Sequence, residues 1–200
     1  MLLNRFEKAL MNNAVRAAIQ RHLEARQLLA LGGRLNGGVA LEVGCGRGVG
    51  VGVILERFGA DRVDAFDLDP GMVALARQRV ARHAGQVRLW TGDASNIAAP
   101  DGAYDAVFDF GIIHHVPEWR RAVREVARVL KPGGRFYAEE MYRRFVHSTL
   151  ERTFTQHPDT DGFDGDELAL EVERQGLRLL GRRDVAGLFG WLAAEKPSWR

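Results

Sequence analysis

The residues Leu41-Glu-Val-Gly-Cys-Gly-Arg-Gly48 connect a short apolar run, Val39–Val43, to a helix-like segment, Val49–Phe58. Glycines at positions 44, 46, 48, 50 and 52 allow a ligand to approach the backbone closely. The helix N-terminus that follows favours anionic groups. The turn falls at the carboxyl end of a buried strand, where open α/β sheets bind their ligands. This stretch therefore predicts an α/β fold with a ligand-binding loop.

Strand-like and helix-like segments alternate after this loop. The further strands are expected at Arg62–Asp67, Val87–Thr91, Ala106–Phe110 and Arg135–Glu139. Asp69 is expected to cap a helix that starts at Pro70, and Pro117 is expected to open another. Apolar strands that alternate with helices indicate a parallel sheet covered on both faces.

The C-terminal part has a different pattern. A helix is expected over Asp166–Gln175, followed by strands Leu177–Asp184 and Leu188–Glu195 with a turn at Ala186-Gly187. Two strands joined by so short a turn must be antiparallel. The predicted fold is therefore Rossmann-like and doubly wound, with a mostly parallel seven-stranded sheet, an antiparallel C-terminal hairpin, and helices on both faces.

Composition limits the class of protein. The chain has 200 residues, of which 46% are hydrophobic and 27% charged, as in a globular domain. A single cysteine excludes a disulfide scaffold and a multi-cysteine zinc site, and no metal site is predicted. Arg5, Glu7 and Lys8 interrupt the N-terminal apolar residues, which argues against a signal peptide. A cytoplasmic location is expected.

The glycine spacing argues against a dinucleotide cofactor. The pattern G-x-G-x-x-G would place its third glycine at Val49, Val51 or Val53, depending on the starting glycine. No register fits, so an oxidoreductase with a nucleotide cofactor is the weaker alternative.

Four motifs in order make the chain resemble the class I S-adenosylmethionine-dependent methyltransferases. They are Leu41–Gly48, Ala65-Phe-Asp-Leu-Asp-Pro70, Thr91-Gly-Asp-Ala94, and the pair Tyr104–Val116 with Ala127–Gly134. The last pair is similar to the small-molecule branch, which includes quinone-biosynthesis enzymes. The resemblance implies S-adenosylmethionine as cofactor and S-adenosylhomocysteine as product.

The resemblance also implies a set of cofactor-binding residues. These are Glu42, Gly44, Cys45, Gly46, Gly48, Asp67, Leu68, Met72, Asp93, Ala94, Asp109 and Phe110. Asp67 would accept hydrogen bonds from the ribose hydroxyls, and Asp69 is the competing carboxylate, assigned to capping. Asp93 and Ala94 would meet the adenine, which Leu68 and Met72 would flank, although Met72 suits the core equally. Asp109 and Phe110 would border the methionine part.

Direct, in-line displacement at the methyl carbon needs positioning and, for some substrates, a general base. His115, just after the fourth strand, is the first candidate, and its alternative role is to cap the helix at Pro117. Glu139 and Glu140 end the fifth strand, and alternation predicts that one faces the pocket and the other solvent. Glu140 is the second catalytic candidate. The stretch Asp109-Phe-Gly-Ile-Ile lacks the Asn/Asp-Pro-Pro-aromatic motif of base-methylating enzymes, so a nucleic-acid substrate is not expected.

Two segments remain for substrate recognition. Residues 1–36 are predicted to form a helical cap on a methyltransferase domain at 37–200, because the faces Leu3, Phe6, Leu10 and Val15, Ile19, Leu23 need burial. This segment carries six Arg/Lys and two Glu, and a second interpretation is peripheral contact with an anionic membrane. Residues 141–165, with Tyr142, Phe145, Phe154 and Phe163, are expected to form a substrate lid, or else a helix that simply covers the sheet.

The sequence thus predicts an enzyme that transfers a methyl group from S-adenosylmethionine to a small molecule, aromatic or lipid-like. A non-catalytic S-adenosylmethionine-binding protein is the main alternative. The oligomeric state is left open.

Overall fold

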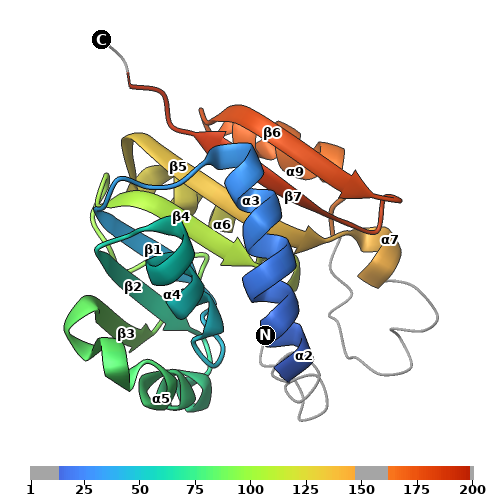
Figure 1. The fold of residues 1–200 in the computed structure, drawn as a ribbon. Coiled ribbons are helices and arrows are strands. Elements are labelled where there is room, and N and C mark those ends of the chain that lie inside the picture. Colours follow the sequence, from blue (N-terminus) through green and yellow to red (C-terminus); the bar gives the residue numbers. More distant parts are fainter. Residues whose placement is uncertain (1–13, 147–161, 199–200) are drawn as a thin grey trace.

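The computed structural model describes residues 14–146 and 162–198 (Figure 1). The strands are β1 Val39–Val43, β2 Arg62–Asp67, β3 Val87–Thr91, β4 Tyr104–Phe110, β5 Leu130–Met141, β6 Arg178–Val185 and β7 Phe189–Glu195. The α-helices are α2 Ala14–Ile19, α3 Ala25–Gly32, α4 Val49–Val53, α5 Pro70–Arg79, α6 Trp119–Val129, α7 Arg143–Val146 and α9 Gly165–Arg174. The π-helices are η1 Gln20–Glu24 and η2 Ile54–Phe58, and the 3₁₀ segments are η3 Ala81–Gln86 and η4 Ile113–His115.

The strands form one seven-stranded sheet in the order β3-β2-β1-β4-β5-β7-β6. The first five strands in the chain are parallel, whereas β7 pairs antiparallel with both β5 and β6. This arrangement confirms the predicted Rossmann-like sheet with an antiparallel C-terminal hairpin. The carboxyl ends of β1, β2 and β4 consequently meet at one edge.

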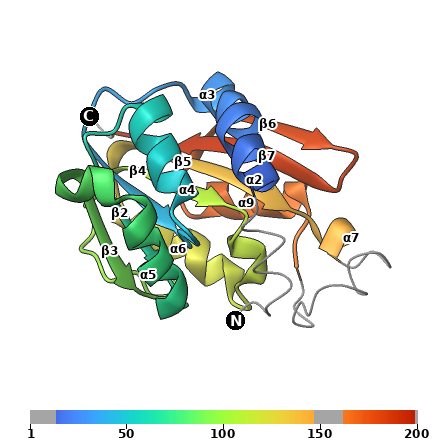
Figure 2. The ribbon, with the colours of Figure 1, turned by 60° about the horizontal axis from the view of Figure 1, so that its bottom comes forward.

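Helices cover both faces of the sheet (Figures 1 and 2). On one face α6 and α9 bury a core that includes Val123, Val126 and Leu168. On the other face α3, α4 and α5 bury a second core that includes Leu28, Val51 and Ala76. Both faces of the strands are therefore apolar, which explains their nearly continuous hydrophobic runs.

The helix formed by α2, η1 and α3 runs across the second face and is buried in part. Ala25 and Leu28 are completely buried, and the Tyr137 hydroxyl donates to the Gly32 carbonyl oxygen at 3.1 Å. The predicted burial of Ile19 and Leu23 is wrong, since they are 41% and 48% exposed.

The π-helical turn η1 explains part of the difference between predicted and observed burial, because it shifts the buried face of the helix away from the regular 3.6-residue period. The buried side chains of η1 are Gln20 and Glu24 instead. Leu3, Phe6, Leu10 and the Val15 side chain lie outside the described residues. The boundary at residues 36 and 37 stays a prediction.

Several element boundaries differ from the predicted ones. The strand β4 begins at Tyr104, and α6 begins at Trp119 rather than at Pro117. The strand β5 begins at Leu130, which pairs with Tyr104 before the register shifts, so the expected turn at 131–134 is an irregularity within the strand. A capping box between Asp164 and Glu167 starts α9.

Two aromatic residues of the predicted lid belong to the core. Tyr142 is 2% exposed and donates its hydroxyl proton to Asp184 at 2.6 Å, while Phe163 is 1% exposed and packs against the Trp119 ring. Phe154 lies outside the described residues, so the lid stays a prediction. No helix in the described part of the chain is long and apolar enough to cross a membrane.

Candidate functional site

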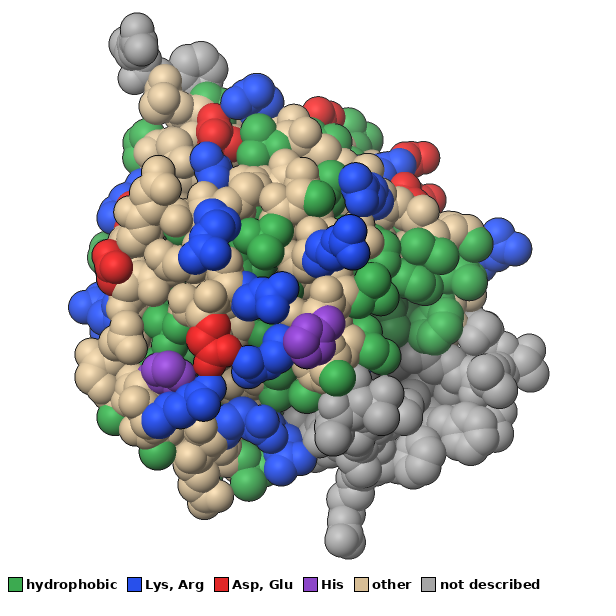
Figure 3. Space-filling view, viewed as in Figure 1, with side chains coloured by type: hydrophobic (Ala, Val, Ile, Leu, Met, Phe, Trp, Pro, Cys, Tyr) green, Lys and Arg blue, Asp and Glu red, His purple; other side chains and the backbone are tan. Residues whose placement is uncertain are grey.

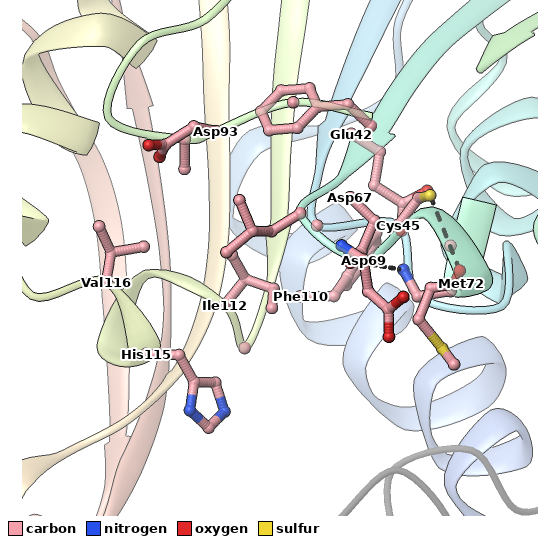
Figure 4. A pocket seen from close by; sticks show the side chains of 18 of the residues that line it. Glu42, Cys45, Asp67, Asp69, Met72, Asp93, Phe110, Ile112, His115 and Val116 are labelled. Atoms are coloured by element: carbon pink, nitrogen blue, oxygen red, sulfur yellow. Dashed lines mark hydrogen bonds between the residues drawn. The ribbon is translucent and has the colours of Figure 1, made fainter. Parts of the chain in front are cut away.

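A cavity of about 370 Å³ opens at the carboxyl edge of β1, β2 and β4. Eleven of the predicted site residues line it: Glu42, Gly44, Cys45, Gly46, Asp67, Leu68, Met72, Asp93, Ala94, Phe110 and His115. Figure 4 shows Asp67, Cys45 and Met72 on one side, His115 and Val116 on the other, and Ile112 and Phe110 between them. Residues from motifs far apart in the sequence therefore share one cavity.

The glycine loop brings backbone up to this cavity. Gly44, Gly46 and Gly48 have φ values of 68°, 48° and 77°, a region that L side chains rarely adopt. A Cβ atom at Gly44 would collide with Ile112, and one at Gly50 would collide with the Glu42 carboxylate. The glycines therefore serve both the loop conformation and close packing around the cavity.

Asp67 and Asp69 have different contacts, and the predicted capping role of Asp69 is confirmed. Asp67 accepts the Gly46 backbone N–H at 2.8 Å and the Asp69 N–H at 2.9 Å, so it also shapes the loop. Asp69 accepts the Gly71 N–H at 2.8 Å and is the N-cap of α5, with Pro70 at the first helical position. Both carboxylates line the cavity.

Glu42 is the buried acidic group of the cavity. It is 2% exposed, and burial raises the pKa of its carboxyl well above the usual value, with the nearby Asp67 carboxylate adding to this. Its Oε2 atom has no hydrogen-bond partner among the described residues. A cationic ligand group beside Glu42 would satisfy that oxygen and would favour the ionised carboxylate. The ammonium group of a bound S-adenosylmethionine fits this requirement.

At the far end of the cavity, Asp93 and Ala94 follow β3. The Asp93 Oδ1 atom accepts the Ser95 backbone N–H at 2.8 Å, which fixes the turn that places the carboxylate at the cavity. Leu68 is 44% exposed here, and Met72 lines the same region instead of being buried in the core. An adenine ring between these apolar side chains would cover them.

Three predicted residues do not line the cavity. Gly48 is buried where a Cβ atom would lie 3.1 Å from Ala76, so it permits α5 to pack closely on the loop. Asp109 is completely buried, and its Oδ1 atom accepts the Ile112 N–H at 2.9 Å behind the cavity wall. Glu140 is 1% exposed and also lies behind the wall.

Glu140 supports the backbone that carries the histidines. Its Oε1 atom accepts the N–H groups of Ile113 at 2.6 Å and His114 at 3.3 Å, and its Oε2 atom contacts His114 Nδ1. Burial raises the pKa of Glu140 to about 8. His115, the next residue, lines the cavity and is 6% exposed. Glu140 therefore supports this backbone from behind the wall, whereas His115 reaches the cavity itself.

Glu139 points to the opposite face of the sheet, as strand alternation requires. The expectation that one of the two glutamates faces solvent is wrong, because helices cover both faces and Glu139 is only 6% exposed. Arg16 bridges Glu139 at 3.1 Å and Glu24 at 2.5 Å. Burial, followed by the Glu24 charge, raises the pKa of Glu139 to about 8.

Sequence reasoning missed Arg16 and Gln20, which form the cavity wall contributed by the N-terminal helix. Gln20 is only 8% exposed although its side chain is polar. No local pattern in the sequence indicates this placement. Cys45 also lines the cavity, and burial raises the pKa of its thiol, which favours the protonated form.

Comparison with known proteins agrees with this geometry. Residues 40–134 match a family model described as a methyltransferase domain. Malonyl-[acyl-carrier protein] O-methyltransferase of Serratia marcescens is 36% identical over 129 residues, which cover 64% of this chain and 48% of that protein. A probable S-adenosylmethionine-dependent methyltransferase of Mycolicibacterium smegmatis is 37% identical over 170 residues, covering 85% of this chain and 62% of the relative. The chain spans about half the length of the curated relatives it matches.

Solved structures share the fold at low sequence identity. A chain in the Haloferax volcanii complex of the Trm112 methyltransferase activator and a putative methyltransferase superposes with a TM-score of 0.80 and 19% identity, covering 98% of this chain and 100% of that one. A putative methyltransferase from Bacillus halodurans gives 0.74 and 17% identity, covering 87% and 99%. The solved structures show the shared fold, and the sequence matches show that residues 40–134 are similar to a methyltransferase domain and that the chain has homologues among the S-adenosylmethionine-dependent methyltransferases.

Proposed function

We propose that this protein transfers a methyl group from S-adenosylmethionine to a small-molecule acceptor. The observation that carries the proposal is the cavity in which Glu42 Oε2 lacks a partner among the described residues, beside the Asp67 carboxylate and the glycine loop. Glu42 would bind the cofactor ammonium, Asp67 the ribose hydroxyls, and Asp93 with Ala94 the adenine. When bound, the cofactor supplies an electrophilic methyl group.

His115 is the proposed general base. It lines the cavity on the side opposite Asp67, where an acceptor would have to sit to face the methyl group (Figure 4). Glu140 and His114 would hold the backbone that presents it. The glycine loop and Phe110 would exclude water, so positioning and desolvation supply most of the rate enhancement.

The acceptor class is proposed to be aromatic or lipid-like. Relatives are named as O-methyltransferases of ubiquinone biosynthesis and of fatty acids. On this chain, exposed Ile19 and Leu23 lie on the helix whose Arg16 and Gln20 line the cavity, so an apolar acceptor could approach along it. The same helix remains our candidate for peripheral contact with an anionic membrane.

Calorimetry with S-adenosylmethionine and with NAD tests the cofactor assignment. Wild-type protein should bind only the first, and Asp67→Ala should weaken binding by about tenfold or more, because each lost hydrogen bond to a charged group is worth roughly 1.5–3 kcal/mol. Asp69→Asn is the matched control, since asparagine also caps a helix. Equal losses in both variants would contradict the role given to Asp67.

Methyl transfer onto phenols, quinols and fatty acids then tests catalysis. Turnover on any of these separates an enzyme from a non-catalytic cofactor-binding protein. Tight cofactor binding without transfer to any acceptor of the panel would favour the non-catalytic alternative.

A further inference from the structure

A second cavity, of about 440 Å³, lies between the helix of α2 and η1 and the end of α5. Small or apolar side chains line part of it: Ala17, Ala18, Gly48, Val49, Gly52 and Val80. The other lining residues are all basic and come from two separate segments: Arg21, His22, Arg79, Arg82 and His83. None of the described residues that line this basic groove is acidic.

The positive charge of the basic groove is held in place but not neutralised. Glu56, on η2, accepts Arg21 Nη1 at 2.6 Å and Arg82 Nη2 at 2.5 Å. One carboxylate thus anchors two guanidinium groups, each of which has further N–H donors. Arg79 is exposed, and its guanidinium has no hydrogen bond or ion pair with the described residues. The groove therefore retains a net positive charge.

A purely local explanation covers only part of this arrangement. Arginines at the end of α5 offset the negative end of its helix dipole. That reason does not apply to Arg21 and His22, which reach the same cavity from η1. Figure 3 shows Lys and Arg side chains gathered around two histidines on this face, with few acidic side chains among them.

We propose that the basic groove binds the phosphate group of an anionic ligand. Guanidinium groups match phosphate geometry because they donate pairs of parallel hydrogen bonds. The small lining residues, such as Ala17, Ala18 and Gly52, leave room for the anion to reach the guanidinium groups. Since Val49 lines both cavities, a phosphate held here would lie against the loop that carries the proposed cofactor site. A soluble phosphate ester and an anionic lipid headgroup present the same chemistry.

Titration with inorganic phosphate at constant ionic strength, followed by NMR, tests the groove. Saturable shifts at millimolar phosphate are expected, and Arg79→Gln should raise the dissociation constant about tenfold. Arg77→Gln is the matched control, because it removes the same charge from the same helix, α5. The Arg77 side chain does not line the groove, and its guanidinium donates to the Leu89 carbonyl oxygen at 3.1 Å.

Sedimentation with phosphatidylglycerol and phosphatidylcholine vesicles distinguishes the two sources. The groove is assigned to lipid headgroups if the protein sediments only with the anionic vesicles and shows no saturable binding of inorganic phosphate. In that case Arg79→Gln should weaken sedimentation and Arg77→Gln should not. Saturable phosphate binding without sedimentation assigns it to soluble esters. Equal effects of the two substitutions, or no binding in either assay, would overturn the proposal.

Discussion

Asp109 and Glu140 show how burial changes the role of a carboxylate beside a ligand cavity. Asp109 precedes Phe110 in β4, and Glu140 follows Glu139 in β5. Phe110 and Glu139 pair with each other and point to the opposite face of the sheet. Alternation therefore directs Asp109 and Glu140 behind the wall, where they accept backbone N–H groups. Their sequence positions resemble those of ligand-binding groups, but their contacts are those of supports.

His115→Ala should reduce the turnover number about 100- to 10,000-fold, the range of general-base assistance. Affinity for S-adenosylmethionine should change little, because the side chain lies on the opposite side of the cavity from Asp67. Steady-state kinetics against pH, with calorimetry on the same variant, measures both effects.

Glu140→Gln is the companion variant for the positioning role. It keeps the acceptor for the Ile113 N–H, so it should fold and should bind cofactor, but it changes the group that contacts His114. A displaced pH profile with near-normal cofactor affinity is expected.

Unchanged turnover of His115→Ala at every pH would mean that the histidine is structural or that the acceptor arrives ionised.

Among the elements, β1, β2 and β3 have the bounds that the sequence predicts, because each is a short run closed by loop residues such as Gly44 and Gly92. The start of β5 was not predictable in this way. Residues 131–134 have turn composition, yet they lie within the strand because Leu130 before them pairs with Tyr104 and Arg135 after them pairs with Ala106. Tertiary pairing overrides local preference there.

Two leucines of the N-terminal helix give an internal comparison. Leu28 is completely buried, whereas Leu23 is 48% exposed. Leu28→Ala should lower the free energy of unfolding by about 2–5 kcal/mol, the cost of a cavity in a core. Leu23→Ala should change it by less than about 0.5 kcal/mol, as for exposed positions. Denaturant unfolding of both variants measures the difference, and a large loss for Leu23→Ala would show that this face is covered in solution.

At the scale of the whole molecule, the sequence predicts the part of the site built by local motifs and misses the part built by folding. Asp67 ends β2, and Gly44 and Asp93 lie just after β1 and β3, so the parallel sheet brings the three residues together. Arg16 and Gln20 lie more than twenty residues before the glycine loop, and only the packing of the helix directs them into the cavity. No local pattern specifies that contact.

The buried carboxyls make stability depend on pH in an unusual direction. Glu139 and Glu140 each have a pKa raised to about 8 by burial, and Arg16 can neutralise only one of Glu139 and Glu24. Unfolding returns both groups to about 4.3, so the native state binds more protons between these values. With respect to these groups, the free energy of unfolding should therefore be highest at low pH and should fall as pH rises from about 4.3 to about 8.

Thermal unfolding from pH 6 to pH 9 measures this effect. The melting temperature of the wild type should fall up to about pH 8, and that of the double variant Glu139→Gln/Glu140→Gln should fall less, because glutamine keeps hydrogen-bonding groups but does not titrate. Glu173→Gln, at an exposed position of α9, is the matched control and should leave the slope unchanged. The prediction is contradicted if the wild-type melting temperature rises over this range, or if the double variant shows the wild-type slope. Either result would mean that both carboxylates are ionised in the native protein. The Arg16 bridge and the His114 contact would then compensate for their burial.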